Sequence, residues 1–186
     1  LTGNSVIIIL GPTCVGKTGA SILLARELDT EIISADSMQI YRHMDIGTAK
    51  PTPEQLAMVR HHLIDIAEPS EIFSAGQYAE AVRPIIENIH AKGSTPVVVG
   101  GTGLYIKALT RGIFRSPSAD WALRDNLHSI EKQKSGSLYS LLLKLDHAAA
   151  SSIEPADTRR LIRALEVCLK TGKGVSGLRA ELTMPL

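Results

Sequence analysis

A glycine-rich run near the start of the chain combines residue types that bind phosphate. It matches the spacing G-x-x-x-x-G-K-[ST] at every fixed position and lies between an apolar run and an amphipathic one. Its glycines let successive backbone N–H groups point at phosphate oxygens. Lys17 adds a positive charge, and the hydroxyl of Thr18 can ligate a phosphate-bound Mg²⁺. We therefore predict a diphosphate site with magnesium at Gly11, Pro12, Thr13, Cys14, Val15, Gly16, Lys17 and Thr18.

This motif recognises a diphosphate but does not define which bond breaks. ATP is the commonest ligand of such loops, so a small-molecule kinase is one interpretation, which requires an acceptor site and a second acid for the metal. Asp36 follows the apolar run 31–35 and is a candidate for that acid, for a helix cap or for a catalytic group. Cys14 lies inside the loop, where a small filler residue is the simpler interpretation.

Strands and helices are predicted to alternate in the first part of the chain. Strands are expected at 5–10, 31–35, 62–66 and 95–99, and helices at 17–28, 52–60 and 74–90. Capping boxes begin the last two helices at Thr52 and Ser74, and Pro84 should kink the third. This order predicts an α/β fold, a P-loop NTPase-like parallel sheet flanked by helices. Asp36 and Thr102 both follow strand ends, so we expect them on the same rim as the glycine-rich loop.

After Gly112 no convincing strand follows, and a small, inserted, all-helical lobe is predicted. Its helices are expected at 121–132, 138–145 and 157–171. Gly172 should cap the last one, and Trp121 should anchor the core of the lobe. We therefore divide the chain into a catalytic core, 1–115, and a helical lobe, 116–186. A sheet followed only by helices indicates that the sequence is incomplete at its C-terminal end.

Composition and charge narrow the function classes. The chain is 44% hydrophobic with a net charge of +1, which suits a well-packed core and not a disordered chain. The apolar run 6–10 is too short to cross a bilayer, and Cys14 and Cys168 have no metal-site spacing. We therefore expect a cytoplasmic protein without membrane contact. Residues 156–179 hold six basic side chains against two acidic ones, which indicates either a polyanion site or an ordinary solvated helix face.

Several longer blocks give the sequence a family resemblance. They read ISADSMQIYR at 33–42, MDIGTAKP at 44–51, HHLIDI at 61–66, VGGTGLY at 99–105 and RRLIRALE at 159–166. Together with the G-P-T form of the glycine-rich loop, they occur in the order and register of the tRNA dimethylallyltransferases, also called tRNA isopentenyltransferases. The chain strongly resembles that family from about residue 5 to residue 175.

The resemblance implies a reaction and roles for individual residues. Members transfer the dimethylallyl group of dimethylallyl diphosphate to N6 of the adenosine immediately 3′ of the anticodon in tRNA, and they release diphosphate. The glycine-rich loop would hold the diphosphate, with Thr13 near the departing bridging oxygen and Mg²⁺ near Thr18. Asp36 would be the general base that takes the proton from the exocyclic amine. The tRNA contacts implied are Asp36, Ser37, Met38, Gln39, Thr102, Arg124, Arg159, Arg160, Leu161, Ile162 and Arg163.

The sequence departs from the family pattern at Cys14, where small residues, often alanine, are usual, and at His43, where glycine is common. Neither change removes a group that the reaction needs. Family members are also longer, with further strands and a further arginine-bearing tRNA segment, which puts the activity of this chain in question. We expect a monomer, and we interpret His61 and His62, which lack metal-spaced partners, as structural.

Three alternatives to tRNA prenylation stay open. An adenylate isopentenyltransferase would use free AMP, ADP or ATP as the acceptor and share the loop and the Asp36 region. A small-molecule P-loop kinase would consume ATP. A truncated chain would bind tRNA or diphosphate without catalysis. The basic helix and the helical lobe favour tRNA as the acceptor.

Overall fold

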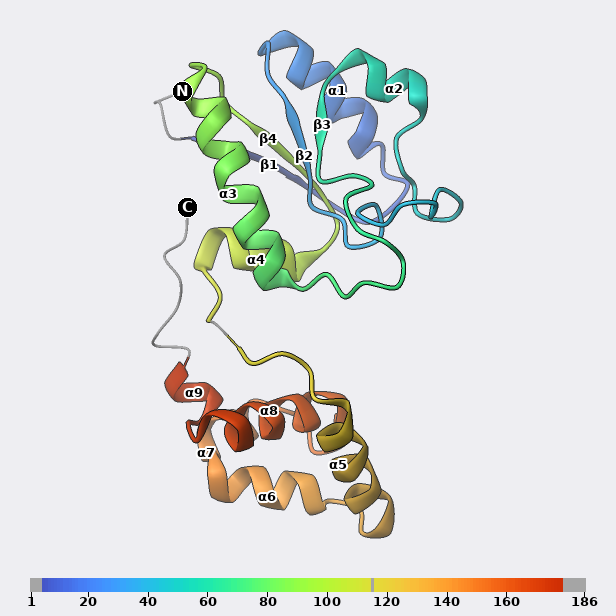
Figure 1. Ribbon diagram of the computed structural model, residues 1–186. Helices are drawn as coiled ribbons and strands as arrows, with labels where there is room; N and C mark the ends of the chain where they lie inside the picture. Colours follow the sequence, from blue (N-terminus) through green and yellow to red (C-terminus); the bar gives the residue numbers. More distant parts are fainter. Residues whose placement is uncertain (1–4, 115, 179–186) are drawn as a thin grey trace. The chain divides into compact units, whose positions relative to one another are not determined.

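The computed structural model describes residues 5–114 and 116–178, which form two compact units (Figure 1). The units divide in the sequence between Ile113 and Phe114, close to the boundary expected after residue 115. Each unit has its own hydrophobic core. Across the described ranges, no helix is both long enough and apolar enough to cross a membrane.

The first unit is built on a parallel four-stranded sheet with the strand order β1-β4-β2-β3. Every neighbouring pair of strands is parallel. Its elements are β1 (Ile7–Leu10), α1 (Lys17–Glu27), β2 (Ile32–Ser34), α2 (Pro53–Met58), β3 (His61–His62), α3 (Ala75–Ala91), β4 (Val97–Gly100) and α4 (Gly103–Arg111). A helix lies in sequence between successive strands, as parallel pairing requires. This arrangement confirms the predicted P-loop NTPase-like α/β fold.

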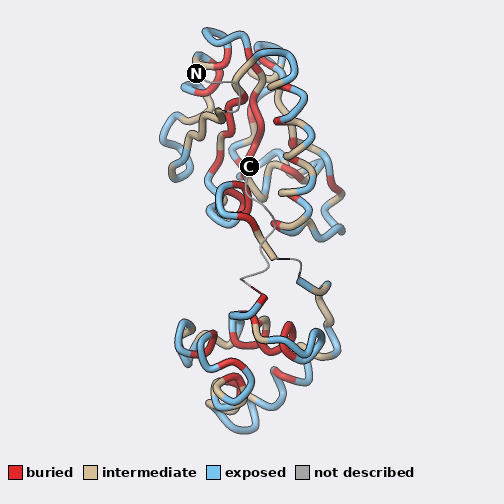
Figure 2. Tube along the Cα trace, turned by 90° about the vertical axis from the view of Figure 1, so that its left-hand side faces the viewer, coloured by how far each residue is buried: buried red, intermediate tan, exposed pale blue. Residues whose placement is uncertain are grey.

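Alternate residues of the two central strands face opposite helical layers. Ile33 and Val98 belong to the cluster formed with α3 and α4, whereas Ile32 and Val97 pack in a second cluster with Ile22 of α1. Because side chains alternate along a strand, these two clusters place helices on both faces of the sheet. Figure 2 shows the same strands as the buried centre of this unit. The C-terminal ends of the strands are therefore set on a rigid, double-sided core.

Local signals predicted several element ends correctly. The capping boxes are present at Thr52 and Ser74, where each side chain accepts a hydrogen bond from the backbone N–H three residues on. The strand expected over 62–66 is wrong, because the φ angles of Leu63 and Asp65 are +61° and +55°. A left-handed backbone cannot continue a strand, so β3 ends at its second residue.

Helix α3 was expected from the sequence, whereas helix α4 was found only in the structure. Helix α3 continues through Pro84 as one helix. Helix α4 was not predicted, although its buried residues Tyr105, Ile106 and Leu109 follow helical spacing. It begins directly after Thr102, so it extends from the same strand end that carries this residue.

The second unit contains only helices in its described part. They are α5 (Trp121–Gln133), α6 (Ser137–Leu145), α7 (His147–Ser151), α8 (Thr158–Thr171) and α9 (Val175–Leu178). The core is aliphatic, with Leu138, Leu142, Leu161 and Leu165 fully buried. Gly172 ends α8 at a φ of +68°, which confirms the predicted glycine cap. Trp121 is 61% exposed, so the prediction that it anchors this core is wrong.

Candidate active site

The glycine-rich loop connects β1 to α1 and exposes backbone at the helix start. Gly16, the N-cap of α1, has a φ of +86°, a left-handed conformation that glycine adopts without strain. Cys14 adopts a similar conformation, with a φ of +67°. Among the described residues, no side chain caps α1, so its first N–H groups stay available to an anion. The loop therefore has the form that the sequence predicts for a phosphate site.

The side chain of Lys17 folds back onto the glycine-rich loop. Its Nζ donates a hydrogen bond to the carbonyl oxygen of Pro12 at 2.6 Å. The ammonium group therefore lies over the loop, where it can exchange this carbonyl for a phosphate oxygen. Thr18 follows on the first turn of α1, one residue from Lys17.

A cavity of about 310 Å³ brings the loop together with the rim of the sheet. Thr13, Lys17 and Thr18 line it from the loop and α1, and Asp36 and Gln39 line it from the segment after β2. This juxtaposition confirms that the loop and Asp36 share one rim. A bound diphosphate and a carboxylate would therefore face the same volume.

Gly100 lets β4 approach the segment that carries Asp36. A Cβ atom at position 100 would lie 2.2 Å from the carbonyl oxygen of Ala35, which no side chain can tolerate. The backbone N–H of Ala35 donates to Val99 at 2.7 Å, and the N–H of Thr102 donates to Ala35 at 3.1 Å. These backbone contacts fix the main chain of Ala35, directly before Asp36.

The turn from Asp36 to Gln39 is tied to the end of β4. The Asp36 carboxylate accepts a hydrogen bond from the backbone N–H of Met38 at 2.9 Å, which orients it by one oxygen. The hydroxyl of Thr102 accepts from the N–H of Ser37 at 2.8 Å and lies 3.2 Å from the Ser37 hydroxyl. The structure thus gathers four of the predicted site residues into one hydrogen-bonded group.

Gln39 is held by the protein on both ends of its amide. Its oxygen accepts from the Ser34 hydroxyl at 3.0 Å, and its nitrogen donates to the carbonyl of Ala49 at 2.9 Å. Met38 beside it is 44% exposed, so its side chain is available to a partner. The predicted nucleotide contact at Gln39 is therefore a residue with a fixed orientation in this structure.

Lys50 is a buried cation next to this site that the sequence analysis did not single out. Its Nζ lies 2.7 Å from Asp45 Oδ1, 2.7 Å from Asp65 Oδ1 and 2.9 Å from the Tyr41 carbonyl oxygen. Burial lowers the pKa of Lys50, but the hydrogen bonds to the two carboxylates raise it, and the net pKa lies above the usual lysine value. Lys50 is therefore charged in the folded chain.

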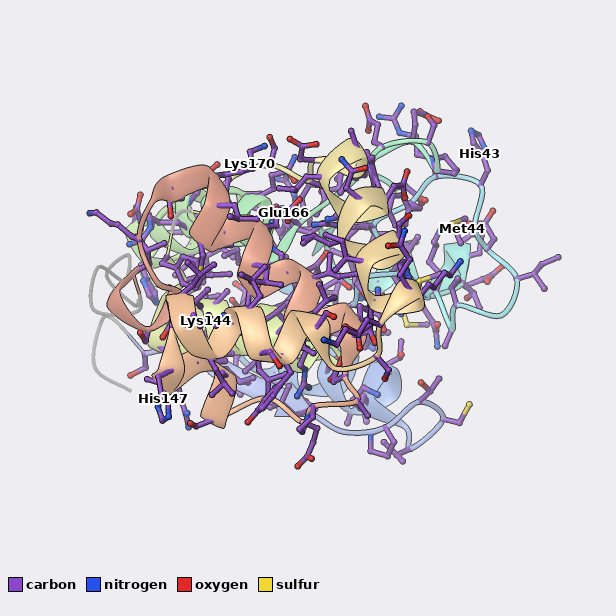
Figure 3. The ribbon with its side chains drawn as sticks, turned by 90° about the horizontal axis from the view of Figure 1, so that it is seen from below. His43, Met44, Lys144, His147, Glu166 and Lys170 are labelled. Carbon is purple, nitrogen blue, oxygen red and sulfur yellow. The ribbon has the colours of Figure 1, made fainter. Side chains whose placement is uncertain are left out.

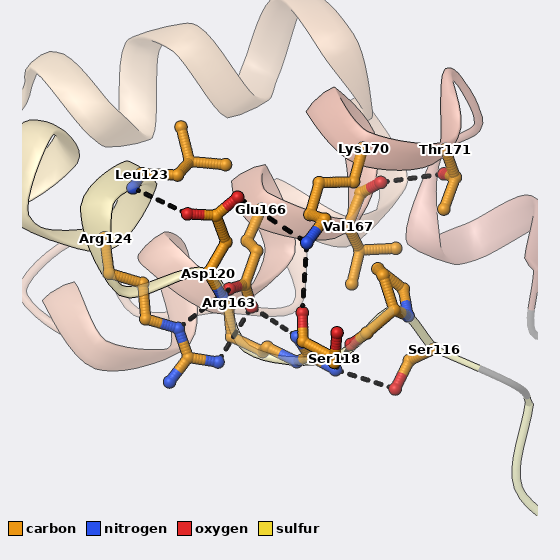
Figure 4. A network of polar contacts seen from close by, with 11 residues as sticks. Ser116, Ser118, Asp120, Leu123, Arg124, Arg163, Glu166, Val167, Lys170 and Thr171 are labelled. Carbon is orange, nitrogen blue, oxygen red and sulfur yellow. Dashed lines mark hydrogen bonds and ion pairs between the residues drawn. The ribbon is translucent and has the colours of Figure 1, made fainter.

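Helix α8 carries a second charged cluster, in the helical unit (Figure 4). Glu166 is fully buried, and its two oxygens accept hydrogen bonds from Arg124 at 2.9 and 2.8 Å. Arg163 and the backbone N–H of Asp120 also donate to this carboxylate. Burial raises the pKa of Glu166, but these hydrogen bonds lower it to about 2. Glu166, which the sequence analysis left unassigned, therefore fixes the guanidinium groups of Arg124 and Arg163.

The predicted tRNA contacts of α8 differ in exposure. Arg159 and Arg160 are exposed, whereas Leu161 and Ile162 are buried in the core of the helical unit. The prediction that Leu161 and Ile162 contact tRNA is therefore wrong for their side chains, because helical periodicity turns them inward. Arg163 is partly exposed and also donates to Ser116 and Pro117.

Trp121 and the histidine pair His61 and His62 each have a defined partner within their own unit. The Arg124 guanidinium carbon lies 5.1 Å from the centre of the exposed Trp121 ring, a cation–π contact. His62 Nε2 lies 2.5 Å from Glu31 Oε2, and His61 Nδ1 lies 2.8 Å from the Val59 carbonyl oxygen. The partner of His62 agrees with its structural interpretation, whereas His61 also lines the cavity, so its structural interpretation stays a prediction. Burial, the largest cause, lowers the pKa of His61.

Comparisons with known proteins agree with this geometry. The IPP transferase family model matches residues 39–185. A tRNA dimethylallyltransferase of Thermodesulfovibrio yellowstonii is 54% identical over 183 residues, which cover 98% of this chain and 58% of that protein. One from Thermotoga maritima is 49% identical over 176 residues, which cover 95% of this chain and 58% of that protein. The chain therefore spans somewhat more than half the length of these relatives.

Solved structures give the same result. The tRNA isopentenylpyrophosphate transferase of Bacillus halodurans matches 91% of this chain and 57% of that chain, with 45% identity and a TM-score of 0.59. A eukaryotic dimethylallyltransferase acting on tRNA matches 98% of this chain and 46% of that chain, with 33% identity and a TM-score of 0.80. The family-model match, the shared fold and these identities lead to one conclusion: the chain belongs to the IPP transferase family.

Proposed function

We propose that the chain is the catalytic core of a tRNA dimethylallyltransferase. It would transfer the dimethylallyl group of dimethylallyl diphosphate to N6 of the adenosine immediately 3′ of the anticodon. The observation that carries this proposal is the cavity shared by the loop residues Lys17 and Thr18 and by Asp36. A site that grips a leaving diphosphate and faces a carboxylate is suited to attack by a weakly nucleophilic amine. The relatives named above act on tRNA by name, which points the same way.

The proposed reaction is a substitution at C1 of the dimethylallyl group. The bond from C1 to the bridging oxygen breaks, and its electron pair leaves with the diphosphate, while positive charge spreads over the allyl unit. The N6 lone pair forms the new bond to C1, and an N6 proton passes to the carboxylate of Asp36. Backbone N–H groups of the loop and Lys17 stabilise the negative charge on the diphosphate. Thr13, which lines the same cavity, would donate a hydrogen bond to the bridging oxygen.

Magnesium is the proposed cofactor. Thr18 and Asp36 line the cavity with hydroxyl and carboxylate oxygens, the donors that Mg²⁺ prefers. Within residues 5–114 and 116–178, His, Cys, Asp and Glu side chains form no group of three that could hold an ion. This donor set fits an ion bound mainly by diphosphate oxygens, with Thr18 as a protein ligand. When bound, Mg²⁺ neutralises charge on the leaving group.

The helical unit is the proposed tRNA-binding part. Arg159 and Arg160 expose guanidinium groups on α8, and Arg124 and Arg163 are held in fixed orientations by Glu166. Arginine recognises phosphate oxygens through paired N–H donors. The target base would leave its stack before it reaches the cavity. We further propose that the protein acts as a monomer in the cytoplasm, where tRNA is available.

The proposal is tested by incubating the chain with Mg²⁺, labelled dimethylallyl diphosphate and either unmodified tRNA or AMP. Label in tRNA, lost when the target adenosine is replaced, supports the proposal. Label in AMP alone would assign the chain to the adenylate isopentenyltransferases. Consumption of ATP without use of the allylic ester would assign it to the kinases. Binding of tRNA or diphosphate without transfer would identify a chain that is catalytically silent by itself.

A further inference from the structure

All three N–H donors of the Lys50 ammonium group are used within the protein, so Lys50 does not bind substrate phosphate directly. An ammonium group has three N–H donors, and the oxygens of Tyr41, Asp45 and Asp65 supply three acceptors within 2.9 Å. The Lys50 side chain is only 5% exposed. A cation that is fully hydrogen-bonded and buried acts through the residues that it holds. The role of Lys50 therefore depends on which segments of the chain carry those three oxygens.

The three acceptors join two segments that are distant in sequence. Tyr41 and Asp45 belong to residues 41–50, here called the 41–50 loop, and Asp65 follows β3. Direct neighbours of these anchors line the cavity, namely Ala49, Pro51 and Ile64. Lys50 therefore connects the parts of the chain that form one wall of the candidate active site.

The backbone of this wall is strained. His43, Ala49, Leu63 and Asp65 have φ angles of +62°, +51°, +61° and +55°, in the left-handed region that residues with a Cβ disfavour. Such conformations persist where the surrounding structure holds them in place. Figure 3 shows His43 and Met44 on the 41–50 loop, where His43 is exposed and Met44 is partly buried. The cation at the base of the loop is thus the group placed to hold these conformations.

We propose that Lys50 is a positioning residue, whose ammonium group fixes the 41–50 loop as a wall against which the acceptor nucleoside lies. This inference rests on the proposed function, because the nucleoside is the acceptor of that reaction. Gln39 provides the link, since its side-chain nitrogen donates to the Ala49 carbonyl beside Lys50. If the 41–50 loop became mobile, the turn from Asp36 to Gln39 would therefore lose one of its fixed contacts.

The diphosphate side of the cavity does not depend on Lys50. The glycine-rich loop is held by β1, by α1 and by the hydrogen bond from Lys17 to Pro12. Loss of the Lys50 ammonium should therefore impair use of the acceptor and leave binding of the donor intact. A merely structural role would affect both substrates alike, so the two cases can be separated.

The kinetic test compares Lys50→Met with Lys50→Arg and with Lys92→Met as a matched control. Lys92 donates to Glu31 Oε1 at 2.6 Å outside the cavity lining, so the control removes an ion-paired lysine elsewhere in the same unit. We expect Lys50→Met to lower kcat/KM for tRNA by about 10²-fold, as misplaced reacting groups do. The KM for dimethylallyl diphosphate should change less than about twofold, because the donor site is intact. Lys50→Arg should recover part of the loss, and Lys92→Met should match the wild type.

Amide hydrogen exchange on the same variants gives a readout that needs no turnover. Lys50→Met should speed exchange in residues 39–50 and 63–66 and leave residues 11–18 unchanged. Unaltered exchange in 39–50 overturns the inference, because Lys50 would not hold the loop. Equal losses for both substrates, or no kinetic change, also overturn it. If the wild type fails to modify tRNA, the proposed function is rejected, and with it the acceptor role of Lys50. The exchange experiment would then still show whether Lys50 holds the loop.

Discussion

The hydroxyl of Thr102 accepts a hydrogen bond from the backbone N–H of Ser37 at 2.8 Å, across 65 residues of sequence. This bond joins the end of β4 to the turn that carries Asp36. Because the Asp36 carboxylate is itself bonded to Met38 in that turn, Thr102 contributes to where the carboxylate lies. The side chain of Thr102 is therefore already engaged within the protein, and its effect on the reaction should run through the turn.

Replacing Thr102 with valine tests this relationship. Valine keeps the shape of the side chain but leaves the Ser37 N–H without its acceptor, which costs about 1 kcal/mol, the low end of the usual range, because this donor is only part-buried. We expect turnover on tRNA to fall by about tenfold through misplacement of the turn. Thr102→Ser keeps the hydroxyl and should retain most of the activity. Steady-state kinetics on both variants decide the matter, and equal rates for valine and serine would disprove the role of the hydroxyl.

Asp36 should be required for chemistry and not for binding tRNA. Asp36→Asn keeps the oxygen that accepts from Met38 but cannot take a proton, so turnover should fall by about 10²-fold or more. Single-turnover rates with saturating enzyme isolate the chemical step. Binding of unmodified tRNA should be unchanged, measured in parallel on the same variant. Near-normal turnover in Asp36→Asn would remove this residue from the mechanism.

Stability of the helical unit should fall with the pH between about 4.5 and about 2. The pKa of Glu166 is about 2 in the folded chain, against a usual value of 4.5. A carboxyl group with a lowered folded pKa stabilises the fold fully above its unfolded pKa, and this stabilisation is lost as the pH falls through the folded pKa. The difference corresponds to about 3 kcal/mol. Trp121 is the single tryptophan, so urea unfolding followed by its fluorescence measures this unit.

Replacing Glu166 by glutamine should produce the same loss at neutral pH. The variant leaves Arg124 and Arg163 without their buried counter-charge, which should lower the free energy of unfolding by about 3 kcal/mol. The pH dependence below 4.5 should also become shallower. Glu154→Gln changes an exposed carboxylate in the same unit and serves as the control. Identical unfolding curves for Glu166→Gln and the wild type would show that the cluster adds no stability.

The salt dependence of tRNA binding should identify the phosphate contacts on α8. Arg159 is exposed, so Arg159→Gln should reduce the slope of log affinity against log salt by about one unit. Arg160 lies 3.4 Å from Asp157, and its replacement should have a smaller effect because this charge is already partly neutralised. Lys144→Gln on α6 is the control, an exposed cation on a different helix (Figure 3). An unaltered slope in Arg159→Gln would assign this face of α8 to solvent.

Features fixed by neighbouring residues could be predicted from the sequence. The phosphate loop, the capping boxes at Thr52 and Ser74 and the glycine cap at Gly172 each depend on a few adjacent residues. Their types determine the backbone conformation almost alone. The position of Asp36 on the same rim as the loop also followed from the sequence, because parallel strands end at one edge of the sheet.

Features fixed by distant partners could not be predicted in this way. The early end of β3 comes from the left-handed residues Leu63 and Asp65, and the carboxylate of Asp65 is held by Lys50 from another segment. Glu166 is separated by 42 residues from Arg124, so an ordinary helix-face carboxylate and a buried counter-charge look alike in the sequence. Trp121 was assigned to the core on residue type alone, and the aliphatic residues of α6 and α8 fill that volume instead.

The absence of a side chain at Gly100 limits which substitutions can reshape the candidate active site. A methyl group at this position would overlap the carbonyl of Ala35. The packing of β4 against the segment after β2 therefore cannot be altered by a larger residue at position 100. Changes that accommodate a different acceptor are therefore expected in the 41–50 loop, which forms part of the cavity wall. Variation in acceptor size among related proteins should be sought in that loop and not in the strands.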